Sequence, residues 1–145
     1  MEELMCMLKI ISDNIRILHR NLKGSHYMGI HNYLGDLYEE IDEMCDDIVE
    51  ISIASGLTEP NVVKAAEVYP CISTNRLMKG FTAKEALSFV YKYFNDLIDA
   101  MKNAKKGVPD FIKAKLDEYQ YWLFKEANYK IERELTEWYD RVGRR

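Results

Sequence analysis

The apolar residues of the first half of the chain recur at alternating steps of three and four, the spacing of one face of an α-helix. One stripe comprises Leu4, Leu8, Ile11, Ile15, Leu18 and Leu22, and the next comprises Tyr27, Ile30, Leu34, Leu37, Ile41, Met44, Ile48 and Ile51. We expect Gly24 to end the first helix and Ser25 to cap the second. The second stripe predicts a helix over residues 27–54, about 40 Å long at roughly 1.5 Å per residue.

The helical pattern stops between residues 57 and 80. Pro60 can open a short helix over residues 61–67, and Pro70 can stop it. From there to Gly80 the sequence predicts a connection with little regular structure. A connection of this length can carry the chain from one end of a helical bundle to the other.

Two further helices are predicted in the second half. Thr82 and Glu85 have the spacing of a capping box, and Pro109 can open the last helix after a break at Gly107. Their apolar stripes comprise Leu87, Val90, Phe94, Leu97, Met101 and Ala104, and then Ile112, Leu116, Tyr119, Leu123, Ala127, Ile131, Leu135 and Trp138.

Two helical hairpins joined by one long connection define the ferritin-like class of bundle. The sequence therefore predicts an all-α protein: a single domain over residues 1–145, folded as a ferritin-like four-helix bundle. A long crossover carrying a short helix would join the second and third helices.

Composition narrows the possible functions. The formal net charge of −4 speaks against a general nucleic-acid binder. No apolar run approaches the roughly 20 residues that span a bilayer, and the first residues lack the features of a signal peptide. Three cysteines without CxxC spacing argue against a disulfide framework or a zinc ribbon. We expect a cytoplasmic protein.

All three histidines lie near the first turn. His19 precedes Gly24 by five residues and His31 follows it by seven, so an antiparallel hairpin puts them at similar heights on facing helices. Two imidazoles at one level can contribute to a transition-metal site. Taken alone, each histidine is more often a surface or core residue, and His26 in the turn is expected to be a surface or interface residue.

Carboxylates cluster further along the second helix, at Asp42, Glu43, Asp46, Asp47 and Glu50. Asp46 and Glu50 are four residues apart on one helical face, so both can reach the same ion. Carboxylates combined with imidazoles suit iron, although a solvated acidic face explains the cluster alone equally simply.

The histidines and the carboxylates cannot meet within one protomer. His31 and Asp46 are fifteen residues apart, which is about 22 Å along a helix. Across a twofold axis that sets the helices antiparallel, the histidine end of one protomer meets the acidic end of its partner, and the contact occurs twice.

The segment Leu18-His19-Arg20-Asn21-Leu22-Lys23-Gly24, followed by His31, by Asp36-Leu37-Tyr38 and by the Asp46–Glu50 pair, resembles the signature of the Dps family of mini-ferritins. That signature is His-Trp-Asn-Val-Lys-Gly, then a second His twelve residues after the first, then Asp-x-x-x-Glu. The spacings here match, with twelve residues from His19 to His31, fifteen to Asp46 and four to Glu50. The element order and the short helix of the crossover extend the resemblance over the chain.

The resemblance implies an inter-subunit ferroxidase centre. Its catalytic and metal-binding residues would be His19 and His31 from one protomer and Asp46 and Glu50 from its twofold mate. It further implies a homo-dodecamer built from twofold dimers. Such a shell oxidises Fe(II), preferably with hydrogen peroxide and more slowly with dioxygen, and stores ferric mineral in its hollow interior.

The sequence departs from the family pattern in three respects. Arg20 stands where the family has a Trp, and Gly35 stands where a carboxylate is common. Because the first helix is expected to begin almost at Met1, there is no room for the basic N-terminal tail with which some members hold DNA. This departure speaks against DNA binding. Arg141, Arg144 and Arg145 are expected to form a solvated helix end.

Three other functions compete with this interpretation. A di-iron ferritin or rubrerythrin needs Glu-x-x-His pairs within one bundle, and no histidine follows position 31. A non-catalytic shell protein is favoured by Arg20 and Gly35. A DNA-protecting protein is disfavoured by the charge.

Overall fold

The computed structural model describes the backbone of residues 1–141 and the side chains of residues 1–136. Its regular elements are all helical, which confirms the prediction of an all-α protein. The described residues fall into a first unit, Met1–Ala83, and a second unit that begins at Lys84. The predictions for Trp138, Arg141, Arg144 and Arg145 fall on side chains outside the described ones.

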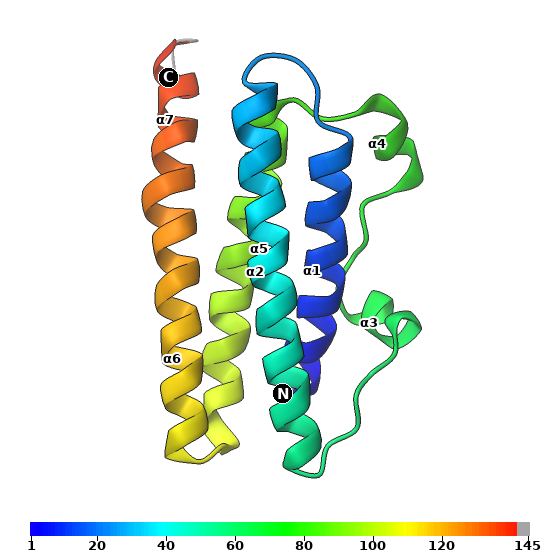
Figure 1. The fold of residues 1–145 in the computed structure, drawn as a ribbon, viewed down its shortest axis with the longest axis vertical. Helices are drawn as coiled ribbons and strands as arrows, with labels where there is room; N and C mark the ends of the chain where they lie inside the picture. The colour runs from blue at the N-terminus through cyan, green and yellow to red at the C-terminus, as the bar shows by residue number, and fades with distance from the viewer. Residues whose placement is uncertain (142–145) are drawn as a thin grey trace. The chain divides into compact units, whose positions relative to one another are not determined.

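The first unit is built on an antiparallel hairpin of α1 (Glu2–Arg20) and α2 (Tyr27–Ala54), shown in blue and cyan in Figure 1. The observed bounds of α2 are those that the sequence predicts. The two apolar stripes are the core of this hairpin, because the buried residues include Leu8, Ile11, Ile15 and Leu18 of α1 and Leu34, Leu37, Ile41 and Ile48 of α2. Burial of these side chains is the main force holding the helices together.

The turn between the two helices differs from the prediction. The last residue of α1 is Arg20, so Gly24 lies in the loop, with a φ of +90°. Ser25 is not the N-cap of α2, which is His26, in the left-handed region with a φ of +67°. The early end of α1 has a clear cause: the backbone beyond it pairs with Phe81, which donates its N–H to Asn21 O (3.0 Å) and accepts from Lys23 N (2.8 Å).

The crossover contains one more helix than the sequence predicts. The expected short helix is α3 (Val62–Val68), and its N-cap Asn61 accepts a hydrogen bond from Lys64 N at 2.9 Å. A second short helix, α4 (Thr74–Lys79), occupies the stretch expected to be irregular, with Ser73 as its N-cap. The six residues of α4 are too few to show a helical period, so the apolar pattern does not indicate this helix.

The crossover is attached along the length of α1. Near its start, Glu59 forms an ion pair with Lys9. In its middle, the fully buried Asn14 donates to Pro70 O at 3.1 Å and accepts from Ile72 N at 3.3 Å. The pairing with Phe81 anchors its far end, so the segment returns the chain to the turn end of the hairpin (Figure 1).

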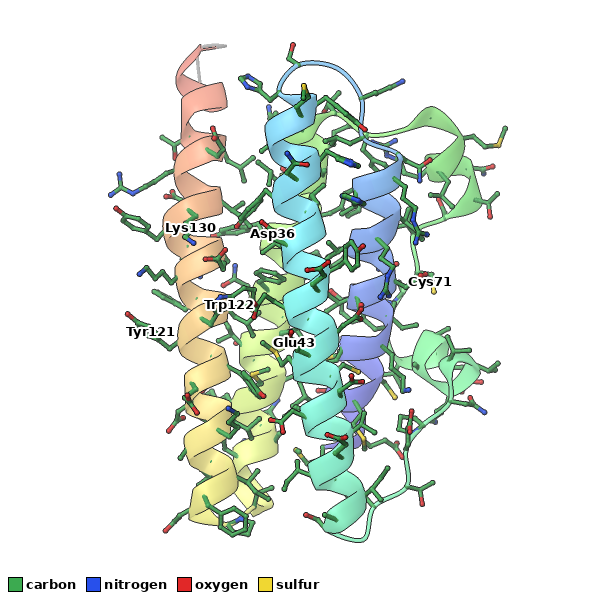
Figure 2. All side chains as sticks on the ribbon, in the orientation of Figure 1. Asp36, Glu43, Cys71, Tyr121, Trp122 and Lys130 are labelled. Atoms are coloured by element: carbon green, nitrogen blue, oxygen red, sulfur yellow. The ribbon has the colours of Figure 1, made fainter. Side chains whose placement is uncertain are left out.

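The second unit contains α5 (Ala83–Ala104), a 3₁₀ turn η1 (Lys105–Gly107) and α6 (Asp110–Lys125). The helix then continues through a π-helical segment, η2 (Glu126–Ile131), into α7 (Glu132–Arg141). Trp122 of α6 packs against Phe94 of α5, with ring centroids 5.7 Å apart, whereas its neighbour Tyr121 projects outward (Figure 2). Gln120 also donates to Ile98 O at 2.9 Å.

The π-helical segment was not predicted. It buries Glu126, whose carboxylate accepts from Lys130 Nζ at 2.6 Å, and it places Asn128 where it donates to Asn95 of α5 at 3.0 Å. A π-turn inserts a residue into an α-helix, so the side chains that follow it are rotated relative to a regular helix.

The three cysteines differ in their exposure to solvent. Cys6 is buried and Cys45 is half-buried. Cys71 is exposed on the crossover, where Figure 2 labels it. Burial raises the pKa of the Cys45 thiol to about 11, so this side chain stays protonated at neutral pH. Within residues 1–141, no helix combines the length and the apolar character needed to cross a membrane.

Candidate metal centre

His19 and His31 come together at the turn end of the hairpin. His19 lies in the last turn of α1 and His31 in the second turn of α2. Their rings are stacked, with centroids 3.8 Å apart and planes inclined by 13°. The prediction that the two histidines stand at one height on facing helices is therefore confirmed.

The two histidines hold each other through their backbones. His19 Nδ1 lies 2.6 Å from the carbonyl oxygen of His31, and His31 Nδ1 lies 2.8 Å from the carbonyl oxygen of His19. A carbonyl oxygen can only accept, so each Nδ1 must carry the proton. In a neutral imidazole this leaves the lone pair on Nε2, which is the form of histidine that binds a metal through Nε2.

Two tyrosines bracket the pair. The ring of Tyr27 stacks on His31, with centroids 5.0 Å apart and planes inclined by 18°. Tyr38 meets His19 edge-on, at 5.5 Å and 62°. Tyr38 is part of the family-like segment Asp36-Leu37-Tyr38, but the sequence alone does not indicate that its ring contacts His19.

Gly35 provides the space that the His19 ring occupies. A Cβ atom placed on Gly35 would lie 3.1 Å from His19 Cε1, a contact tighter than nine in ten real Cβ contacts. In the family pattern a carboxylate is common at the position of Gly35. In the structure the His19 imidazole lies directly against this position. A side chain at residue 35 therefore requires the His19 ring to shift by a few tenths of an ångström.

Replacing Gly35 by alanine should therefore disturb the His19 ring. We expect the Gly35→Ala variant to bind Co(II), measured by visible absorption, about 10- to 100-fold more weakly, the range seen when metal-supporting groups are removed. The matched control is Gly29→Ala in the same helix, where a Cβ meets nothing within 4 Å. That control should keep wild-type affinity and gain up to roughly 1 kcal/mol in free energy of unfolding. Equal Co(II) affinity in both variants would contradict the assigned role of Gly35.

The predicted carboxylate ligands lie elsewhere on α2. Asp46 and Glu50 are exposed and lie fifteen or more residues beyond His31 on one continuous helix. They belong to an exposed acidic face that also includes Asp36 and Glu43, which Figure 2 labels. No group of three His, Cys, Asp or Glu side chains that could hold a metal occurs within the described part of this single chain.

One member of the predicted acidic cluster has a different role. Asp42 turns toward α1, where it accepts hydrogen bonds from Ser12 Oγ and from the Arg16 guanidinium. Ser12 is buried and Arg16 is half-buried. The contact was missed because the sequence gives no sign of which carboxylate faces the neighbouring helix.

Two other residues close to the histidine pair in the sequence, His26 and Arg20, are at the surface. His26 is exposed in the turn, as expected. Arg20 is exposed at the end of α1, next to His19 in the sequence.

The comparisons with known proteins show the fold alone. No family model matches the chain, and no curated protein matches it. The structure is similar to the crystal structure of Helicobacter cinaedi CAIP, with a TM-score of 0.69 and 16% sequence identity. The likeness covers 92% of this chain and 95% of that chain.

Proposed function

We propose that the chain is the subunit of a Dps-type mini-ferritin that oxidises Fe(II) and stores the ferric product. In this proposal the helices form a ferritin-like four-helix bundle. Twofold dimers of the bundle build a dodecameric cytoplasmic shell around a mineral-storing cavity.

The observation that carries the proposal is the reciprocal histidine pair. Two imidazoles, each fixed by its Nδ1–H on a backbone carbonyl, have both Nε2 lone pairs available for a metal. Such a hydrogen bond from the far ring nitrogen is the usual support of a metal-binding histidine.

The site requires a second protomer. Asp46 and Glu50 of the partner subunit would supply the carboxylates that the chain cannot bring to its own histidines, and a twofold axis would create two such sites per dimer. Neutral imidazole and carboxylate together bind Fe(II) and bind the harder Fe(III) still better, which favours oxidation.

The reaction that fits this donor set is oxidation of ferrous iron by hydrogen peroxide. Two Fe(II) ions each give one electron to the peroxide, the O–O bond breaks, and two protons complete two water molecules. The exposed acidic face of α2 offers carboxylates to the ferric product.

The decisive experiment is stopped-flow mixing of anaerobic Fe(II)-loaded protein with hydrogen peroxide, followed by ferric absorbance, with light scattering to give the size of the assembly. We expect faster ferric formation than in buffer, and an oligomer rather than a monomer. A strictly monomeric protein, or a rate of ferric formation equal to that in buffer, would refute the proposed ferroxidase activity.

Gly35 and Arg20 favour one second candidate, a Dps-like shell protein without oxidase activity. The His19 ring lies against Gly35, where the family commonly has a carboxylate. An intact oligomer that leaves the oxidation rate unchanged from that of buffer would identify this alternative.

A further inference from the structure

A polar cluster connects α1 and α2 next to the histidine pair. Arg16 pairs with Asp42 and donates to Ser12 Oγ at 3.3 Å, and Ser12 in turn donates to Asp42. The Arg16 guanidinium also lies over the ring of Tyr38, 4.7 Å from its centroid. Three groups thus fix the guanidinium, and the guanidinium covers a face of Tyr38.

Tyr38, held by the Arg16 guanidinium, in turn limits the movement of the His19 ring. Its ring meets the imidazole edge-on at 5.5 Å. His19 is then confined by the Tyr38 edge, by the stacked ring of His31 and by the backbone of Gly35. Without Tyr38 the imidazole gains room to rotate about its last side-chain bond, so its Nδ1–H is no longer held on the His31 carbonyl.

We propose that Tyr38, held in place by Arg16, is a positioning residue that keeps His19 in its Nδ1–H form with Nε2 available for metal. The role deepens the proposed function and rests on it for the identity of the metal. Asp42 serves this support and is not a metal ligand, because its carboxylate is already engaged by Arg16 and Ser12.

The chemistry of arginine explains why this residue type suits the position. Its planar guanidinium can pair with a carboxylate at its edge while its face stacks on an aromatic ring. A lysine at position 16 could form the ion pair but would lack the flat face. An aromatic ring at position 38 is needed for the contact with His19, whereas its hydroxyl is not.

The test is magic-angle-spinning NMR of metal-free, full-length protein labelled with ¹⁵N-histidine. The chain has only three histidines, and His26→Gln reduces the spectrum to the pair of interest. We expect the wild type to show both histidines in the Nδ1–H form. Tyr38→Leu should give a mixture of tautomers at His19 and weaken Co(II) binding about 10-fold, whereas Tyr38→Phe should behave as wild type.

Two further variants distinguish a specific effect on His19 from a general loss of structure. Arg16→Met should change the His19 signals in the same direction as Tyr38→Leu, and it provides the test if Tyr38→Leu does not fold. Lys9→Met removes a different ion pair of α1, the one with Glu59, and should leave both the spectrum and Co(II) affinity unchanged.

The proposal is overturned if folded Tyr38→Leu keeps the wild-type nitrogen shifts and Co(II) affinity, or if Lys9→Met changes them to the same extent. The spectra are recorded without iron. Failure of the wild type to oxidise iron would therefore reject the proposed function while leaving the positioning role of Tyr38 measurable.

Discussion

An equimolar mixture of two inactive variants of this protein should recover about a quarter of the wild-type rate of iron oxidation, if the site is shared across a twofold axis. One variant lacks the imidazoles (His19→Ala, His31→Ala), and the other lacks the charged carboxylates (Asp46→Asn, Glu50→Gln). Each alone should lose more than roughly 100-fold in rate, since the loss of ligands exceeds the usual effect of losing their supports.

The recovery follows from the geometry of a twofold dimer. Each dimer has two sites, and each site takes its imidazoles from one protomer and its carboxylates from the other. A mixed dimer therefore has one site with every ligand removed and one site that is fully wild-type. Random pairing makes half of the dimers mixed, and half of their sites are intact, which gives about one quarter of all sites.

The controls for this experiment are straightforward. The two variants are co-expressed, or unfolded and refolded together, because separately assembled shells need not exchange subunits. Mixing the assembled variants without exchange should give no recovery. No recovery after verified formation of mixed dimers would exclude a shared site and refute the proposed arrangement.

Replacing Phe81 by alanine should lower the free energy of unfolding by about 3–5 kcal/mol, the cost of removing a buried aromatic ring. Phe81 is completely buried, its backbone pairs with the turn of the hairpin, and Arg76 lies over its ring at 4.2 Å from the centroid. The variant loses the ring packing and also leaves the guanidinium without its aromatic partner.

The measurement is urea unfolding at one fixed protein concentration, since assembly would otherwise shift the apparent stability. Phe111→Ala is the matched control, because Phe111 is 71% exposed and its loss should change the stability by no more than about 0.5 kcal/mol. Equal destabilisation by the two substitutions would show that Phe81 does not anchor the crossover.

The long helices could be predicted because their side chains repeat a simple period. The bounds of α2 match the prediction, since its apolar stripe is regular and Gly56 follows its end. The end of α1 could not be predicted, because Phe81, sixty residues away, takes the hydrogen bonds of the backbone after Asn21. Such long-range pairing leaves no trace in the local pattern. The ferritin-like arrangement of the bundle and the single domain stay predictions.

The π-helical segment corresponds to a feature of the sequence that the helical period alone does not explain. The buried positions Leu123, Ala127, Ile131 and Leu135 follow one another at steps of four. In a regular α-helix each step of four advances by about 40° beyond a full turn, so this stripe would drift around the helix. A wider π-turn absorbs the drift and keeps these residues on one side.

The candidate site was predicted only in outline. The spacing of His19 and His31 about the turn placed them at one height, and the structure brings them into contact. Their tautomers could not be predicted, because these depend on carbonyl groups whose directions follow from the packing of the two helices. The support by Arg16, Asp42 and Tyr38 was missed for the same reason. Pairing with Asp46 and Glu50 of the partner subunit stays a prediction.

The stacking of the His19 and His31 rings has a consequence for how the protein can evolve. Loss of either imidazole removes the stacking partner of the other, so the first substitution should carry most of the functional cost and the second very little. Such strong epistasis makes a descendant with a single surviving histidine a short-lived intermediate. Relatives of this chain should therefore keep both histidines or neither.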